Sequence, residues 1–287
     1  MRAPTASRLA LATLTPLFVA GCQPTAITPQ AADVIQPPEA RVDDAYRTEG
    51  EPEPGEVQPL ELTPAQIVVA IAADPTADPD ARRDALLTII KSSAADEPVY
   101  LNFYRALLVD RSVDPTVAAA AFTALANHGE PADAERILPW LDSDEAFARW
   151  QAAVSLQRLH NPVAIPALIR QTTEDDDADA RMAAVTALGQ YPRRDVFDAL
   201  VIALDDRDYG VSRAARDMLG LLTRHDAGDD PRAWIEYASE NPRTFLADPR
   251  RYTFTPYPGN PELPFFWIKP RPTPKTPVGY TPPSDAE

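Results

Sequence analysis

The sequence of 287 residues is poor in the residue types from which most catalytic and metal sites are built. It has one cysteine, three histidines and ten glycines. A single cysteine excludes an internal disulfide bond and a zinc site made of cysteines. The G-x-S-x-G nucleophile motif, a glycine-rich phosphate loop and the H-E-x-x-H zinc motif are also missing. We therefore predict that the protein is not an enzyme, and we assign it no catalytic residue, metal or cofactor.

Basic residues are scarce as well. The chain has 27 lysines and arginines against 43 aspartates and glutamates, which gives a net charge of −16. Binding to nucleic acid requires a basic surface, so we predict no nucleic-acid partner. An acidic chain is not attracted to anionic lipid headgroups either, so attachment to a membrane has to depend on lipid alone.

The N-terminus carries a predicted lipid anchor. Two arginines accompany a short apolar run at 9–20, which is too short to span a membrane permanently. The run leads into V-A-G-C at 19–22, which resembles the cleavage box of a bacterial lipoprotein signal peptide. The resemblance implies that residues 1–21 are removed and that Cys22 receives lipid, anchoring the chain to the cell membrane on its periplasmic side. Gln23 is not the aspartate that often marks inner-membrane retention, so the outer membrane is favoured; the alternative is an ordinary signal peptide and a free thiol.

Residues 22–60 are predicted to be a tether. They contain seven prolines and a long acidic stretch. Such a composition buries too little apolar surface to order itself, and prolines and like charges keep it extended. We expect the tether to hold the following domain away from the membrane.

An apolar pattern recurs between residues 61 and 241. Its anchor residues are spaced 31 to 36 positions apart, and an acidic residue stands eleven positions before each anchor. A fixed period of this length indicates a solenoid, in which each unit buries its apolar face against its neighbours. Each unit reads as two short helices, so we predict an all-α fold of about five helix pairs. The anchors are Ile89, Leu125, Leu156, Leu188 and Leu219.

Two central units resemble a known repeat family. The stretches at 148–169 (ARWQAAVSLQRLHNPVAIPALI) and 180–204 (ARMAAVTALGQYPRRDVFDALVIAL) look like bacterial HEAT repeats. The resemblance implies an armadillo-like superhelix of antiparallel helix pairs with a convex and a concave wall. The resemblance predicts the fold but does not identify the function. One subfamily, resembling bilin lyases, handles chromophores, so a role in handling a small ligand or cofactor stays open as the alternative.

The concave wall is the default binding surface of a solenoid. Aligning the second helices of the units leaves some residues off their apolar stripe, and we predict that three of these bind a partner protein of the cell envelope. They are Arg136, Trp140 and Arg170. Arginine and tryptophan dominate binding hot spots. Trp140 has a second interpretation, packing against a neighbouring helix. The favoured function is that of a scaffold or assembly factor.

Acidic residues gather in the turns between units, at 142–145, 174–179 and 205–208. Carboxylates at a helix start cap free amides and suit the positive end of the helix dipole. Calcium binding is the alternative, although no cluster has EF-hand spacing. His128 and His160 fall near the ends of successive first helices, where a metal pair or ordinary turn residues are the two options.

Residues 242–287 form a C-terminal extension of a different kind. Twelve of its 46 residues are proline, and from residue 252 onward seven aromatic residues are interleaved with them. A disordered tail rarely carries so much aromatic surface. One interpretation is that residues 252–268 fold back on the solenoid. The other is a proline-rich ligand for a partner groove, for which 269–276 is best suited.

Overall fold

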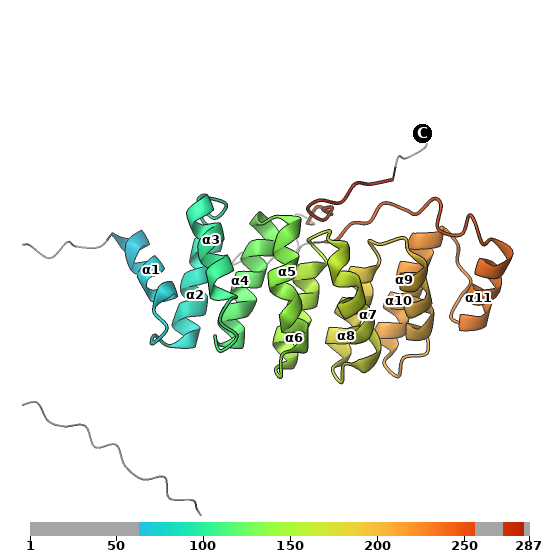
Figure 1. Ribbon diagram of the computed structural model, residues 1–287, viewed down its shortest axis with the longest axis horizontal. Coiled ribbons are helices and arrows are strands. Elements are labelled where there is room, and N and C mark those ends of the chain that lie inside the picture. Colours follow the sequence, from blue (N-terminus) through green and yellow to red (C-terminus); the bar gives the residue numbers. More distant parts are fainter. Residues whose placement is uncertain (1–62, 256–271, 284–287) are drawn as a thin grey trace, which may run out of the picture. The chain divides into compact units, whose positions relative to one another are not determined.

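The computed structural model describes residues 63–255 and 272–283. The predicted signal peptide, Cys22, the tether and part of the C-terminal extension lie outside the described residues. The described part contains eleven α-helices and three short 3-10 helices, and its only extended pairings are two isolated bridges. The helices form consecutive pairs along the domain (Figure 1). The prediction of an all-α solenoid of about five helix pairs is therefore confirmed.

The first helices of the five pairs are α2 (Pro79–Ile90), α4 (Pro115–His128), α6 (Ala146–Leu156), α8 (Ala178–Leu188) and α10 (Tyr209–Thr223). The second helices are α3 (Pro98–Leu107), α5 (Ala134–Ile137) with the 3-10 helix η2 (Leu138–Asp142), α7 (Ile165–Glu174), α9 (Arg194–Ala203) and α11 (Pro231–Glu240). Helix α1 (Pro64–Ala73) precedes the pairs and packs on α2. Two further 3-10 helices, η1 (Pro131–Asp133) and η3 (Pro162–Ala164), lead into α5 and α7.

The first helices begin where acidic residues can cap them. Side chains of Asp78, Asp114, Asp177 and Asp208 accept hydrogen bonds from free amides in the first turns of α2, α4, α8 and α10. Glu145 precedes α6 without such a bond. Helix α1 starts with a capping box between Thr63 and Gln66. The acidic turns at 174–179 and 205–208 thus supply helix caps, as the first of the two interpretations predicts, whereas the turn at 142–145 does not.

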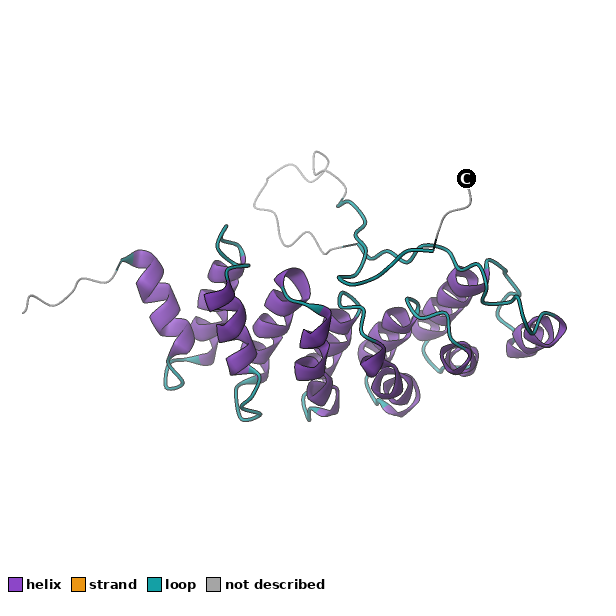
Figure 2. Cartoon of the chain, turned by 45° about the horizontal axis from the view of Figure 1, so that its top comes forward, coloured by secondary structure: helices purple, strands orange, loops and turns teal. Residues whose placement is uncertain are grey.

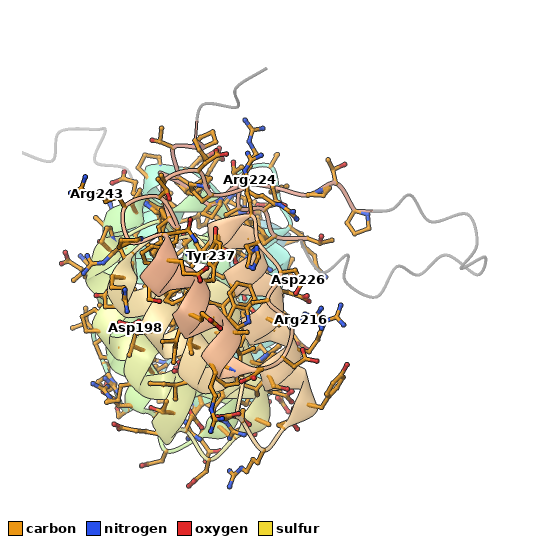
Figure 3. The ribbon with its side chains drawn as sticks, turned by 90° about the vertical axis from the view of Figure 1, so that its right-hand side faces the viewer. Asp198, Arg216, Arg224, Asp226, Tyr237 and Arg243 are labelled. Carbon is orange, nitrogen blue, oxygen red and sulfur yellow. The ribbon has the colours of Figure 1, made fainter. Side chains whose placement is uncertain are left out.

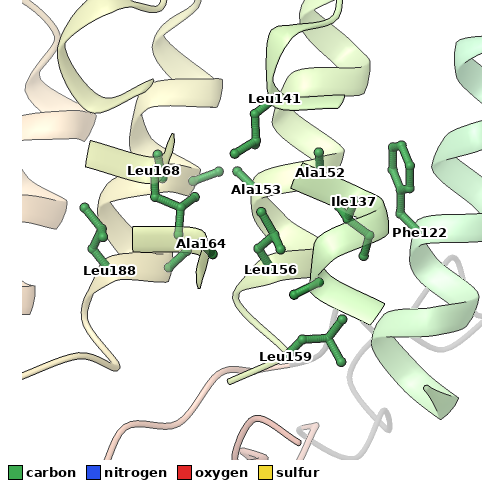
Figure 4. Packing of buried hydrophobic residues seen from close by; sticks show 14 of the residues in the cluster. Phe122, Ile137, Leu141, Ala152, Ala153, Leu156, Leu159, Ala164, Leu168 and Leu188 are labelled. Atoms are coloured by element: carbon green, nitrogen blue, oxygen red, sulfur yellow. The ribbon is translucent and has the colours of Figure 1, made fainter. Parts of the chain in front are cut away.

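The repeat anchors form the core between the stacked pairs. None of the five is more than 5% exposed, and they belong to one continuous hydrophobic cluster. Alanines around them, such as Ala152 and Ala153 beside Leu156, allow neighbouring helices to approach closely (Figure 4). The first helices pack directly on one another, α4 on α6, α6 on α8 and α8 on α10. The core is therefore continuous along the array and has no separate centre in each unit.

Two arginines at equivalent positions of successive units connect the turns between units through hydrogen bonds. Arg149 donates to both carboxylate oxygens of Asp175, at 2.8 Å each, and to the carbonyl oxygen of Ser143 at 2.9 Å. Arg181 repeats this with Asp206, at 2.8 and 2.9 Å, and with the carbonyl of Asp175 at 2.9 Å. Burial alone would raise the pKa of Asp206, but hydrogen bonds from Arg181 and from the amide of Asp208 outweigh it and hold that pKa below its ordinary value.

The last helix pair is closed by aromatic side chains. Trp234 of α11 is buried and donates through Nε1 to the carbonyl of Gly228 at 2.9 Å. The ring of His225 stacks on Tyr237 with centroids 4.0 Å apart. Figure 3 shows Tyr237 and the neighbouring pair of Arg216 and Asp226, which are 2.8 Å apart. These contacts cover the end of the core that has no further unit to pack against.

The described part of the C-terminal extension folds back along the turns that follow the first helices (Figure 2). Phe245 packs edge-on against Phe197 of α9, with ring centroids 5.0 Å apart. Tyr252 is buried, and its hydroxyl accepts from Gln157 and donates to the carbonyl of Thr186, both at 2.8 Å. Packing on the solenoid, the first of the two interpretations of this extension, is thus confirmed for the described residues; 256–271 lie outside them.

Candidate functional site

The candidate site is the second-helix wall, the surface formed by α3, α5 with η2, α7, α9 and α11. Two of the three residues predicted to bind a partner are exposed on it. The side chain of Arg136 is 46% exposed and that of Arg170 is 47% exposed. The two arginines line different depressions of the wall, so the structure does not bring them into one pocket.

The predicted exposure of Trp140 is wrong, because this side chain is only 2% exposed. Its ring packs edge-on against Phe122 of α4 at 5.4 Å between centroids, and the Arg111 guanidinium lies 4.9 Å from its centroid. The reason is local: the α-helix ends at Ile137 and continues as a 3-10 helix through Pro139. Three residues make a full turn of a 3-10 helix, so Trp140 returns to the face of Ile137 and enters the core.

The depression at Arg136 lies between α3 and the start of α5. Its buried centre is Asp133, which accepts from Arg105 at 2.7 and 2.9 Å and from the amide of Glu130 at 2.9 Å. Burial alone would raise the pKa of Asp133, but these bonds outweigh it and hold that pKa below its ordinary value. Arg136 lies 3.9 Å from the same carboxylate. Because Arg105 already holds Asp133, the Arg136 guanidinium is free to meet a further carboxylate.

The depression at Arg170 lies between η2 and α7. Arg170 contacts Asp142 at 2.6 Å, and both side chains are exposed. Arg149 and Asp175 form the second ion pair of this depression. Three more carboxylates line it and form no ion pair with a described residue, so negative charge is in excess here: Asp144, Glu174 and Asp176.

Gln171 is a residue of this depression whose surroundings the sequence does not reveal. It is only 5% exposed, and its amide nitrogen donates to Asp175 at 3.3 Å. Its side-chain oxygen is buried and has no hydrogen-bond partner among the described residues. The spacing of four between Gln171 and Asp175 on one helix face is the only sequence signal for this contact.

The opposite wall, formed by the first helices, has one exposed aromatic pair that the sequence analysis did not select. Phe147 is 49% exposed, and its ring centroid lies 5.8 Å from that of Trp150. Trp150 itself is partly buried and packs against the core. Asp177 and Asp179 line the same shallow depression. An aromatic residue at the second position of α6, where α8 has Asp179, is the signal that points to this feature.

Two of the three histidines, His160 and His225, contact aromatic side chains. His160 stacks on Tyr191 at 4.9 Å between centroids, and its Nδ1 lies 3.0 Å from the side-chain oxygen of Gln190. Within residues 63–255 and 272–283, no group of three or more potential ligands is arranged to hold a metal ion. None of the helices in these ranges has the length and apolar composition that a membrane span requires.

Comparison with known proteins finds a match to the repeats. The family model described as HEAT repeats matches residues 103–188 and, in an overlapping match, residues 165–234. The predicted resemblance to HEAT repeats is therefore confirmed, whereas a bacterial lipoprotein remains a prediction. The comparison with curated proteins gives no match.

Several solved structures are similar to this chain. Human deoxyhypusine hydroxylase in complex with glycerol has 19% sequence identity and a TM-score of 0.38, over 54% of this chain and 72% of that one. An engineered protein has 18% identity and a TM-score of 0.44, over 63% and 87%. The complex of CpcE and CpcF of phycocyanin lyase from Nostoc has 20% identity and a TM-score of 0.35, over 61% and 82%.

These similarities correct the prediction that the protein is not an enzyme. The similar structures include a hydroxylase and a lyase, so the exclusion drawn from missing motifs is wrong. Active sites assemble in space from residues that need not form a sequence motif. At such low identity the similarities establish no activity for this chain.

Proposed function

We propose that this chain, a helical protein built from HEAT repeats, binds a partner protein along its second-helix wall and serves as a scaffold or assembly factor in the cell envelope. The observation that carries the proposal is the pair of open depressions between successive second helices. Each presents one half-exposed arginine beside carboxylates. An open wall with charges of both signs fits a partner surface better than a small enclosed ligand.

The two arginines are available for a partner. An exposed ion pair such as Arg170 with Asp142 contributes little stability, so a partner carboxylate replaces Asp142 at small cost. Arg136 faces a carboxylate that another arginine already holds. Guanidinium groups pair with carboxylates through two parallel hydrogen bonds, which supports specific recognition.

The described C-terminal extension supports the choice of this wall. Its contacts are with the turns that follow the first helices and with the starts and ends of the helices beside them. Arg136 and Arg170 remain half-exposed beside it. We further propose that lipid on Cys22 holds the solenoid at the membrane and that residues 22–60 act as its tether.

Site-specific photo-crosslinking tests the proposal. A photoreactive phenylalanine analogue is placed at the exposed position 135 or 174, each of which lines one depression and leaves Arg136 and Arg170 intact, and at the exposed control position 213 on α10. We expect one envelope protein to crosslink from 135 and 174 but not from 213. Crosslinking that is as efficient from 213, or that occurs only there, would place the binding surface on the first helices.

A second candidate function is the handling of an apolar ligand or cofactor. It is favoured by an apolar depression between α1, α2 and α3, lined by Val68, Val69, Ile89 and Tyr100 among others. If this depression binds ligands, the fluorescence of an apolar naphthalene dye rises with wild-type protein, and Val68→Asp abolishes the rise. An equal rise with both proteins would exclude this depression as the site.

A further inference from the structure

The turn edge is the row of turns that follow α4, α6 and α8, and a short segment of the chain's own C-terminal extension lies across it. Residues 277–280 are the part of that segment that makes close contacts. Pro277 is buried, and the ring of Tyr280 packs edge-on against His160 with centroids 5.4 Å apart. The residues before it, 273–276, are exposed, and among them the backbone of Lys275 pairs with that of Phe254 in the same extension. Residues 277–280 therefore provide the contact with the turns of the solenoid.

The backbone of this segment pairs with the turn after α6. The amide of Val278 donates to the carbonyl of Arg158, and the amide of His160 donates to the carbonyl of Val278, both at 2.8 Å. This is one step of a parallel bridge centred on Leu159 and Val278. Backbone pairing of this kind accepts any extended segment, because it uses no side chain.

Two side-chain positions make the contact selective. Gly279 has φ +81°, and a Cβ atom there would lie 2.5 Å from Cγ of Pro131, so only glycine fits. Tyr280 follows it, and its hydroxyl accepts from the amide of Tyr252 at 3.1 Å. The edge thus selects a glycine followed by a tyrosine.

The segment is separable from the solenoid. None of residues 277–280 belongs to the hydrophobic core cluster or packs against it, unlike Phe245 of the same extension. Three hydrogen bonds hold the segment, and each has a modest net strength in water. Its departure leaves the contacts of Tyr252 with Gln157 and Thr186 in place.

We propose that the turn edge is a binding groove for an extended segment of a partner protein with a Gly-Tyr sequence. The chain's own residues 277–280 occupy the groove and are exchanged for that segment. The inference is independent of the second-helix wall, since it rests on other residues and another face of the units. The proposal gives the Pro-rich extension a function, which is to occupy this groove until a partner segment replaces it.

A competition experiment tests the groove in the full chain. The probe is a fluorescent peptide with the sequence of residues 274–282, PKTPVGYTP, and binding is followed by fluorescence anisotropy. In the wild-type chain the tethered segment competes at an effective concentration on the order of millimolar, so the peptide binds weakly. Gly279→Val and Tyr280→Ala vacate the groove. Thr281→Val is the matched control at a neighbouring exposed position.

We expect the peptide to bind both vacated variants at least about ten-fold more tightly than wild type or Thr281→Val. A peptide with valine in place of its glycine should not bind, and the amide resonance of His160 should shift only with the intact peptide. Thermal melting followed by circular dichroism checks that each variant is folded. If Gly279→Val does not fold, the test uses Tyr280→Ala alone. Equal binding to all four proteins, or none to a folded vacated variant, would overturn the proposal.

Discussion

At the scale of single residues, Arg149 and Arg181 join parts of the chain that the helices alone leave separate. Each guanidinium binds the turn before its own helix and the aspartate of the next turn. The side chains of Arg181 and Asp206 are only 4% and 10% exposed. A buried pair with all its hydrogen bonds made is tolerated, but either partner alone is a buried charge without compensation.

Removing one partner of this pair should therefore destabilise the solenoid. We expect Arg181→Ala to cost roughly 3 kcal/mol and to lower the melting temperature by roughly 6–12 °C. The matched control is Arg213→Ala, whose exposed pair with Asp217 should contribute less than about 1 kcal/mol. Thermal unfolding followed by circular dichroism measures both. Equal melting of the two variants would show that the buried pair is dispensable.

Trp140 shows where residue-level prediction from periodicity fails. An α-helical period of 3.6 residues places it off the apolar stripe, whereas the 3-10 helix at Pro139 turns it into the core. Arg136 precedes this change and Arg170 stands inside α7, and their predicted exposure agrees with the structure. The ion pair of Arg149 was also not predicted, because aspartates 26 residues away give no local pattern.

At the scale of elements, the helix pairs follow from features that are local in the sequence. Acidic caps start four of the first helices, and prolines stand at the starts of others. Repeated apolar residues then give the helices their buried faces. The stacking of pairs could therefore be predicted, and the family match agrees with it. The path of the C-terminal extension across the turns could not be predicted, because it depends on contacts between Tyr252 and residues 66 and 95 positions away.

Shortening an anchor side chain should open a cavity between stacked pairs. Leu156 and Leu188 are fully buried, so we expect Leu156→Ala and Leu188→Ala to cost about 2–5 kcal/mol each. Ile202 is 61% exposed on α9, and Ile202→Ala serves as the control with little expected loss. Chemical denaturation measures the free energy of unfolding of each. Wild-type stability of both leucine variants would contradict the packing register.

At the scale of the whole molecule, the chain combines a solenoid with terminal segments of quite different composition. We propose that the N-terminal segment attaches it to a membrane through Cys22, since the acidic chain has no electrostatic attraction to anionic lipid. A membrane-held solenoid places its walls where envelope proteins pass. The C-terminal extension adds a second surface on the turn edge.

The anchoring proposal has a direct test. Cys22→Ala removes the only lipid acceptor, so the protein should leave the membrane fraction and appear in the soluble fraction. Cys22→Ser is the matched variant with nearly the same size, and it should behave identically. Fractionation and immunoblotting measure the distribution. Persistent association of both variants with membranes would contradict lipid anchoring at this residue.

The most direct test of the central claim is the affinity of the crosslinked partner for charge-reversed solenoids, measured by isothermal titration calorimetry. We expect Arg136→Glu with Arg170→Glu to weaken binding by at least about 30-fold, the equivalent of roughly 2 kcal/mol. The control doublet, Arg213→Glu with Arg243→Glu, changes charge equally at exposed positions outside the second helices and should bind as wild type. Undiminished affinity of the Arg136 and Arg170 doublet, in a protein that melts normally, would contradict a binding site on the second-helix wall.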